Sequence, residues 1–375
     1  MGVYQDLGLQ PLINAWGTVT AVGGSLMAPQ VLDAMREAAG AFVDLHALQR
    51  RAGERIADAL EVDAACVTAG AAAGLVVAAA ACAEEAAEQR PPDDGRPGEC
   101  LMLRAHRNRY DAAVTAAGLR VVEVGARDAV TAEELRAAVT DRTALLLFMA
   151  EAEGVAGSLP LETVAAVMRE RGVRVVVDAA AELPPRTGLA RRLAAGADLV
   201  VVSGGKEIGG PQSSGMILGG VELIDRCTAL AYPHHGIGRA MKTDKETIVG
   251  LMTAVELFAR RDESARFAEW ERRNDELLRG LRGVSGLEAR RHLLTRPGIQ
   301  PASIPRVYVR PLHRTAAEVA AALRTGDPAI VVGVDGDDLA LNPQCLSPAQ
   351  VQPLLRAVVA ACAPRVDPIE VMNFH

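Results

Sequence analysis

Lysine is almost absent from this sequence of 375 residues. Of its 40 basic residues only three are lysine, at Lys206, Lys242 and Lys245. Because a guanidinium stays protonated, whereas a buried ammonium can lose its proton and attack a carbonyl, a retained lysine is a candidate nucleophile. Lys206 has the most suggestive position, since it follows the apolar run 199–202 in the sequence Ser-Gly-Gly-Lys. A solvated loop lysine is the alternative interpretation.

Aromatic residues are also scarce, at 3% of the chain, and the net charge is −7. No basic patch with interleaved aromatics is present, which argues against nucleic-acid binding. No uniformly apolar run approaches the roughly 20 residues that span a bilayer, and the amino terminus has no charged-then-apolar leader. The six cysteines are scattered without a C-x-x-C pair and are typical of small core residues. We therefore expect a cytoplasmic protein with no nucleic-acid, membrane or metal partner.

Short apolar segments alternate with helical patterns over the first two thirds of the chain. Strands are predicted at residues 66–68, 101–103, 121–124, 145–148, 173–177 and 199–202. Helices are predicted near residues 29–41, 48–60, 108–118, 131–139, 161–171 and 246–259, with a loop at 86–99. Continuous apolar strands between helices indicate a mostly parallel α/β sheet covered on both faces.

The remainder predicts a smaller α+β domain. Its elements are a charged helix around 269–271, strands at 306–309 and 329–334, and helices at 315–324 and from 347. We expect three parts: an N-terminal segment (1–45) joining the small domain and the active site, a large cofactor-binding domain (46–258) and a small C-terminal domain (259–375).

Open α/β sheets bind ligands where their strands end. Three predicted strand ends carry suitable groups: the glycine-alanine turn 68–74, Asp178 and Lys206. The turn would let backbone N–H groups approach an anion at a helix start, although close helix packing also explains it. A carboxylate after a buried strand needs a cation or hydrogen-bond donors, although Asp178 also fits a helix N-cap.

Together, these features suggest pyridoxal phosphate (PLP) in an aspartate-aminotransferase-like fold. Lys206 would form the Schiff base, Asp178 would keep the ring nitrogen protonated, and the turn would bind the phosphate. His106, shortly after the strand 101–103, has the position of a residue that stacks on the cofactor ring. A structural histidine is the alternative.

Six sequence blocks carry a resemblance to a known family. They are residues 13–18, 68–74, 178–182, 203–206, 209–215 and 236–242. With these blocks the chain resembles the selenocysteine synthase-like PLP enzymes of fold type I, and most closely the D-glucosaminate-6-phosphate ammonia-lyase group. The resemblance implies an α/β large domain, a smaller α+β domain, and a homodimer or larger homo-oligomer with shared active sites.

The resemblance also implies roles for individual residues. Lys206, Asp178 and His106 are expected to be catalytic. The cofactor is expected to contact Gly70, Ala71, Ala72, Asp178, Ser203, Lys206, Gln212 and Arg239. Apart from the resemblance, we expect the substrate, a small amino compound, to meet Trp16, Thr18, Glu151 and Lys242.

Two departures from the group concern the substrate. Where the group has a Ser-His pair, this chain has Ala150-Glu151, and where the group has an arginine after its Gly-Asp-Pro-x-Ile strand, residues 331–334 contain none. Losing a bidentate carboxylate clamp changes substrate choice. Glu151 would then meet a polar or cationic part of a different amine, or be a solvated loop carboxylate.

The predicted function is a PLP-dependent lyase that eliminates a β-substituent, through a quinonoid intermediate, from an amino acid or amino-sugar acid. Lys206 would remove the α-proton. The alternatives are a PLP-dependent racemase or epimerase, in which His106 or Glu151 would be the second acid, and a seryl-tRNA selenium transferase. A non-catalytic binding protein on the same scaffold and a plain nucleotide-binding α/β protein are further alternatives.

Overall fold

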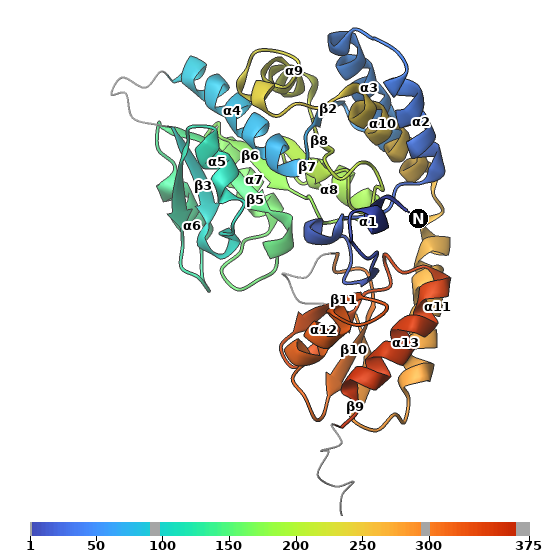
Figure 1. The fold of residues 1–375 in the computed structure, drawn as a ribbon. Helices are drawn as coiled ribbons and strands as arrows, with labels where there is room; N and C mark the ends of the chain where they lie inside the picture. Colours follow the sequence, from blue (N-terminus) through green and yellow to red (C-terminus); the bar gives the residue numbers. More distant parts are fainter. Residues whose placement is uncertain (1, 91–97, 294–300, 365–375) are drawn as a thin grey trace, which may run out of the picture. The chain divides into compact units, whose positions relative to one another are not determined.

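A computed structural model describes residues 2–90, 98–293 and 301–364 (Figure 1). The chain divides into two compact units. The larger unit comprises Gly23–Arg261 and Thr295–Ala302, and the smaller unit comprises Met1–Val22, Asp262–Leu294 and Ser303–His375. Within the described residues no helix is both long and apolar enough to cross a membrane.

The larger unit is built on one sheet, whose described strands run in the order β2-β8-β7-β6-β5-β3-β4. These strands are β2 (Ala64–Thr68), β3 (Glu99–Leu103), β4 (Arg120–Val124), β5 (Thr143–Met149), β6 (Arg174–Asp178), β7 (Leu199–Ser203) and β8 (Gly215–Gly219). All neighbouring pairs from β7 to β4 are parallel, and β8 is antiparallel to both β2 and β7. The predicted mostly parallel sheet is therefore confirmed.

The apolar pattern predicts every strand of this sheet except β8. Its apolar part, Met216-Ile217-Leu218, is only three residues long and lies between glycines, which is typical of a loop. The glycines serve close packing instead: a Cβ on Gly219 would lie 2.5 Å from the Asp198 carbonyl oxygen. The segment is an antiparallel strand.

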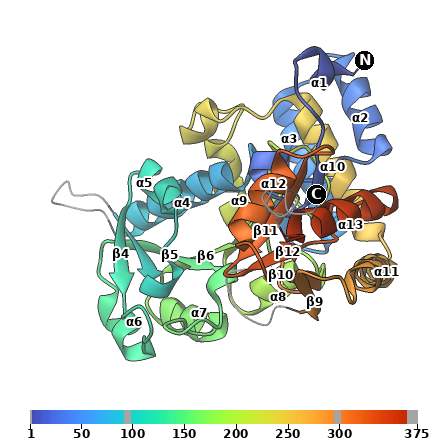
Figure 2. The same ribbon diagram turned by 60° about the horizontal axis from the view of Figure 1, so that its bottom comes forward.

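Helices cover both faces of the sheet. They are α2 (Pro29–Ala39), α3 (Leu45–Leu60), α4 (Ala71–Gln89), α5 (Asp111–Ala116), α6 (Ala132–Ala138), α7 (Leu161–Glu170), α8 (Thr187–Ala194), α9 (Val221–Leu230) and α10 (Lys245–Arg260), with short 3₁₀ turns η2 (Arg104–His106), η3 (Ala150–Ala152) and η4 (Ile237–Ala240). Figure 2 shows α4 and α5 on one side of β4, β5 and β6, with α6 and α7 on the other.

Alternate strand residues enter separate cores on the two faces. In β7, Val200 and Val202 lie in the core that includes α7 and α10, whereas Leu199 and Val201 lie in the core that includes α4 and α9. Both sets are buried, which explains why the strands are continuous apolar runs. The alanine-rich α4 can approach closely, since a Cβ on Gly74 would lie 2.9 Å from the Val201 side chain.

Some predicted boundaries need correction. The helix predicted at 108–118 spans only Asp111–Ala116. Helix α3 begins at Leu45, not 48, because the Asp44 carboxylate caps it by accepting hydrogen bonds from the N–H groups of His46 and Ala47. Helix α4 continues to Gln89, into the predicted loop 86–99, of which residues 91–97 lie outside the described residues.

The smaller unit has a sheet whose described strands run in the order β1-β11-β12-β10-β9. They are β1 (Ile13–Ala15), β9 (Leu287–His292), β10 (Arg306–Pro311), β11 (Ile330–Asp335) and β12 (Asp338–Leu341). The unit's helices are α1 (Val3–Asp6), η1 (Thr20–Val22), α11 (Glu263–Leu281), α12 (Ala316–Arg324) and α13 (Pro348–Cys362). The inward-facing strand residues pack with α11, α12 and α13 in one core.

The pairing of β1 with β11 joins distant parts of the chain. The two strands are parallel, with Ile13 beside Ile330 and Ala15 beside Val332. The glycine-rich sequence after Pro11 does not predict β1. The charged sequence of β9 and the four-residue length of β12 do not predict those strands either. The α+β composition of this part is as expected.

Candidate functional site

Strands β6 and β7 bring Asp178 and Lys206 to one edge of the sheet. The strands are parallel neighbours, with Asp178 beside Val201. Asp178 is the last residue of β6, and Lys206 follows three residues after Ser203, the last residue of β7. Because parallel strands end at the same edge, the carboxylate and the amine lie at the place where α/β proteins bind ligands.

Asp178 is a buried carboxylate, with 7% of its surface exposed. Burial raises its pKa to about 6, while the N–H of Ala180, which donates to Oδ1 at 2.9 Å, and the charge of Lys206 act in the lowering direction. Asp178 has lost hydration on burial and has no bonded cation in the described part of the chain, so a positively charged partner would stabilise its ionised form.

The Lys206 amine is partly buried, and burial lowers its pKa, opposed by the charges of Asp178 and Glu151. Its ammonium forms no hydrogen bond or salt bridge with the described residues. The other lysines differ: Lys245 is paired with Glu246, and Lys242 is exposed over the Tyr232 ring. Lys206 is therefore the lysine whose environment favours a neutral, nucleophilic amine.

Tight glycine packing fixes the loop that carries Lys206. A Cβ on Gly204 would lie 2.2 Å from the Ser214 Oγ, and a Cβ on Gly205 would lie 2.5 Å from the Cα of Gln212. The backbone N–H of Gly204 also donates to the Ser214 carbonyl at 2.9 Å. The Ser-Gly-Gly-Lys sequence thus lets two backbone segments touch.

The turn between β2 and α4 has room at its tip. Gly70 has a φ of +89°, and a Cβ there would meet no heavy atom within 4 Å. Ala71 and Ala72 are the first helical residues and are not buried, so their N–H groups are in the first turn, where no helical acceptor exists. Behind the turn, a Cβ on Gly215 would lie 2.5 Å from the Gly70 carbonyl carbon.

His106 is 1% exposed, and both of its ring nitrogens have partners. The Met149 N–H donates to Nδ1 at 3.1 Å, which leaves the proton on Nε2, 2.8 Å from the Ser158 Oγ. Its ring meets Phe148 edge to face, and burial lowers its pKa to about 4. His106 is consequently a neutral histidine near physiological pH, and stacking on a cofactor remains a prediction.

Glu151 lies in η3, directly after β5, and Met149 at the end of β5 is in register with Asp178. Its Oε1 accepts a hydrogen bond from the Asn108 Nδ2 at 3.2 Å. Nothing in the sequence singles out Asn108, which lies in the loop after η2, 43 residues before Glu151. Only the adjacency of β3 and β5 in the sheet makes this contact possible.

The remaining predicted residues of the larger unit are nearer its surface. Ser203 is partly buried at the end of β7, and Gln212 is exposed beside the backbone of Gly205. Arg239 is exposed in η4, with its guanidinium 5.2 Å from the centre of the Tyr232 ring.

Trp16 and Thr18 belong to the smaller unit. Trp16 is 38% exposed, follows β1 and lies against Gly333, where a Cβ would be 3.3 Å from its ring. Asn14 braces this turn, because its Oδ1 accepts from the N–H groups of Trp16 and Gly17. Thr18 is partly buried. The missing arginine has no replacement within β11 itself.

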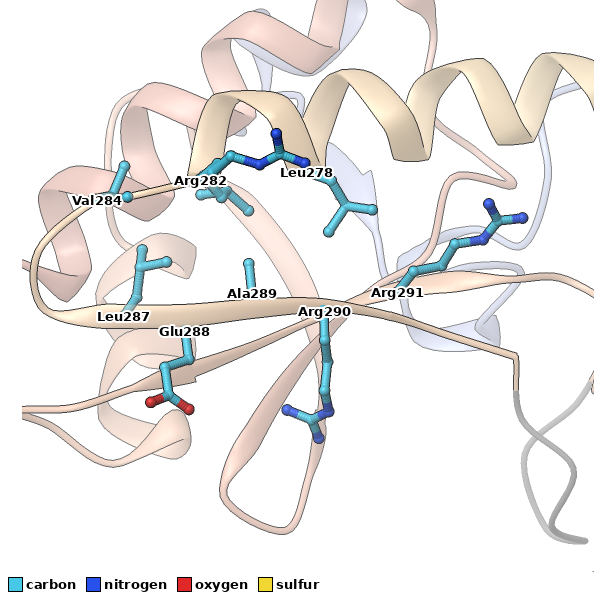
Figure 3. A pocket seen from close by; sticks show the side chains of 10 residues that line it. Leu278, Arg282, Val284, Leu287, Glu288, Ala289, Arg290 and Arg291 are labelled. Atoms are coloured by element: carbon cyan, nitrogen blue, oxygen red, sulfur yellow. The ribbon is translucent and has the colours of Figure 1, made fainter.

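A pocket in the smaller unit lies between the end of α11 and β9 (Figure 3). Leu278, Leu287 and Ala289 point into it, whereas Glu288 and Arg290 point away (Figure 3). None of the predicted site residues lines it. The described residues also contain no group of three or more His, Cys, Asp or Glu side chains suited to a metal ion.

Named relatives align with most of the chain. It is 35% identical to a 5'-C-glycyluridine monooxygenase-decarboxylase from a Streptomyces species, over 94% of this chain and 90% of that protein. It is 36% identical to a D-glucosaminate-6-phosphate ammonia lyase from Salmonella typhimurium, over 68% of this chain and 69% of that protein.

Solved structures share the fold. The structure of a D-glucosaminate-6-phosphate ammonia-lyase has a TM-score of 0.81 and 30% identity, covering 96% of this chain and 98% of that chain. A variant of serine palmitoyltransferase from S. paucimobilis, solved with a bound PLP-myriocin aldimine, has a TM-score of 0.60 at 15% identity, covering 93% of this chain and 86% of that chain. The expected fold, that of the fold-type-I PLP enzymes, is confirmed.

A family-level match agrees with these relatives. The family described as SelA, L-seryl-tRNA selenium transferase, matches residues 12–268. This range contains both Asp178 and Lys206 and more than half of the chain. The chain therefore belongs to the L-seryl-tRNA selenium transferase family, the selenocysteine synthase-like enzymes.

Proposed function

We propose that this protein is a PLP-dependent lyase that eliminates a β-substituent from a small amino compound. The observation that carries the proposal is the pairing of a buried carboxylate, Asp178, with a partly buried amine, Lys206, at the ends of adjacent strands. The family membership and the ammonia-lyase relatives support it.

The donor set fits PLP. Lys206 supplies an amine with a lowered pKa, and Asp178 supplies a buried carboxylate that favours a cation such as a protonated pyridine nitrogen. Ala71 and Ala72 supply N–H groups beside the open space at Gly70, which suits a phosphate. PLP, when bound, supplies an aldehyde for a covalent link and a ring that takes up the substrate's electron pair.

Each residue then has a specific task. Lys206 would hold the cofactor covalently and, once released, take the proton from the substrate carbon that bears nitrogen. Asp178 would hold a proton on the ring nitrogen. Gly70, Ala71, Ala72 and Ser203 would bind the phosphate, with Gln212 and Arg239 as further cofactor contacts. Trp16, Thr18, Glu151 and Lys242 would contact the substrate.

Elimination fits the site better than racemisation. Racemisation needs a second acid on the opposite face of the substrate. His106 is a poor candidate, because its pKa is lowered to about 4 and both ring nitrogens are engaged. We assign it to packing and ring stacking, so Glu151 is the remaining candidate for a second acid, whereas elimination requires one base, Lys206.

A decarboxylase is the second candidate. The Streptomyces monooxygenase-decarboxylase aligns over 94% of this chain, whereas the aligned ammonia-lyase sequence covers 68%. The two activities differ in products, since one releases ammonia and the other CO₂ with consumption of oxygen.

We also propose a homodimer or larger homo-oligomer with shared active sites. Large apolar side chains are exposed on the N-terminal part of the larger unit: Leu26, Leu32, Phe42 and Val43. Phe42 and Val43 are consecutive in the sequence, and large apolar side chains exposed together mark interaction sites. Arg239 and Lys242, with no acidic partner among the described residues, supply cations to such an interface. The division into parts 1–45, 46–258 and 259–375 and a cytoplasmic location also remain proposals.

The experiment is a substrate panel. Purified protein with PLP is mixed with D- and L-amino acids and amino-sugar acids, while ammonia, CO₂, oxygen uptake and the chirality of recovered substrate are measured. We expect ammonia and a keto product that Lys206→Ala abolishes. CO₂ with oxygen uptake would support the second candidate, inverted substrate would support a racemase, and tight tRNA binding at moderate salt would support a selenium transferase.

A further inference from the structure

Glu151 is a carboxylate without a cationic partner among the described residues. It is partly buried rather than solvated. Because it follows β5, and β5 is in register with β6 at Met149 and Asp178, it lies at the edge of the sheet that carries Lys206. Its charge acts on both Asp178 and Lys206, which supports a position facing the site.

Asn108 holds this carboxylate in place. Its Nδ2 donates to the Glu151 Oε1 at 3.2 Å, while its Oδ1 accepts from the Tyr110 N–H at 2.8 Å. The backbone N–H of Asn108 donates to Asp111 at 3.3 Å, and Asp111 is paired with Arg107. The amide is therefore fixed at both ends, and the second oxygen of Glu151 has no partner among the described residues.

Glu153, two residues further on, shows the contrast. It accepts a hydrogen bond from the Leu161 N–H at 3.0 Å and is paired with Arg192. Arg192 also pairs with Glu182 at 2.7 Å. Glu153 is thus part of a structural network, whereas Glu151 retains an oxygen that is unpaired within the described residues, at the edge of the sheet that carries Lys206. The adjacent pair supplies a matched control.

We propose that Glu151, positioned by Asn108, selects substrates that place a hydroxyl or ammonium group against it and rejects those that place a carboxylate or phosphate there. A carboxylate is an acceptor only, so it binds a donor and repels an anion. Asp178 adds negative charge at the same edge of the sheet. The inference rests on the proposed function, since it requires substrate beside Lys206.

A matched series of compounds tests the selection. 2,3-Diaminopropionate, serine and aspartate carry an ammonium, a hydroxyl and a carboxylate at one position. Their dissociation constants from the PLP-loaded protein are measured by visible absorption, using both enantiomers. We expect the first two to bind at least about tenfold more tightly than aspartate, which corresponds to the penalty for one repelled anion.

The variants assign that preference to Glu151. Glu151→Gln keeps the shape and removes the charge, and should reduce the preference to less than about threefold. Asn108→Ala should reduce it in the same direction, whereas Glu153→Gln should leave it unchanged. Three results would overturn the proposal. They are that none of the compounds binds, that aspartate binds as tightly as the other two, or that the preference survives Glu151→Gln.

A second readout needs no substrate. The visible absorption of the bound cofactor would change with pH, and the midpoint of this change would report protonation of the Lys206 nitrogen that is joined to the cofactor. Glu151→Gln should lower this midpoint by about half a unit or more, because it removes a stabilising negative charge. An unchanged midpoint contradicts the inference alone. A wild-type protein without any cofactor absorption contradicts the proposed function and this inference together.

Discussion

Asp178 and Lys206 shift each other's ionisation against the effect of burial. Burial raises the pKa of Asp178 and lowers that of Lys206, whereas the charge of each acts on the other in the opposite direction. In both groups burial is the larger effect. Asp178 is therefore suited to hold a proton on the cofactor ring, and Lys206 is suited to react as an amine. In the cofactor-free protein the same burial lowers the free energy of unfolding.

The first prediction is that Asp178→Asn stabilises the cofactor-free protein at pH 8. The pKa of Asp178 is raised to about 6 from 3.8, so its contribution to stability is present below about pH 4 and lost as pH rises through 6. The ionised form then costs about 3 kcal/mol. Urea unfolding should show the variant gaining up to that amount at pH 8 and nothing at pH 3.5.

The exposed Asp63 gives the control, since Asp63→Asn should leave the free energy of unfolding unchanged at both pH values. The same Asp178→Asn variant should lose turnover. If it is less stable than wild type at pH 8, the buried-charge interpretation is wrong.

The second prediction concerns acid. The pKa of His106 is lowered to about 4 from 6.5, so its contribution is present above pH 6.5 and lost as pH falls through 4. At pH 4.5 the wild type should lose about 2 to 3 kcal/mol from this group. His106→Gln should unfold more readily than wild type at pH 7, and the difference should shrink at pH 4.5.

The difference in stability between wild type and variant, measured in urea at both pH values, separates the contribution of His106 from those of the other titrating groups. A difference that stays constant would mean that His106 titrates normally.

How far the sequence predicts this protein depends on the kind of contact. The apolar run 173–177 predicts β6 and its terminal Asp178, because a strand buried on both faces needs continuous apolar residues. Strand β8 is not predicted, since three apolar residues between glycines carry no period. The β1–β11 pairing escapes prediction because it joins residues far apart in the chain.

The site shows the same division. Lys206 can be proposed from its rarity and from the Ser-Gly-Gly-Lys sequence. Asn108 cannot, because its importance lies in a hydrogen bond to Glu151 that arises only when the adjacent strands β3 and β5 assemble. The neutral state of His106 likewise depends on Met149 and Ser158, which are distant in sequence.

The third prediction concerns the packing behind the phosphate turn. Gly215→Ala places a Cβ 2.5 Å from the Gly70 carbonyl carbon, so the turn must move. We expect a loss of about 1 to 3 kcal/mol in the free energy of unfolding and at least tenfold weaker PLP binding. Gly220→Ala is the control, because no heavy atom lies within 4 Å of its added Cβ. Equal stability and equal PLP binding of the two variants would contradict this prediction.

The fourth prediction concerns assembly. Phe42 is fully exposed, and a charge there should dissociate an interface built on it. Phe42→Glu should change a dimer or larger oligomer into a smaller species in sedimentation experiments. Val221→Glu, at another exposed apolar position on the same unit, should not. A wild type that sediments as a monomer at all concentrations would refute the shared site.

The most direct test is to reduce the PLP-loaded protein with borohydride and locate the adduct by peptide mass spectrometry. We expect a pyridoxyl phosphate group on Lys206 in the wild type and none at this position in Lys206→Ala. An adduct found only on Lys242, Lys245 or the amino terminus, or no adduct in wild type, would contradict it.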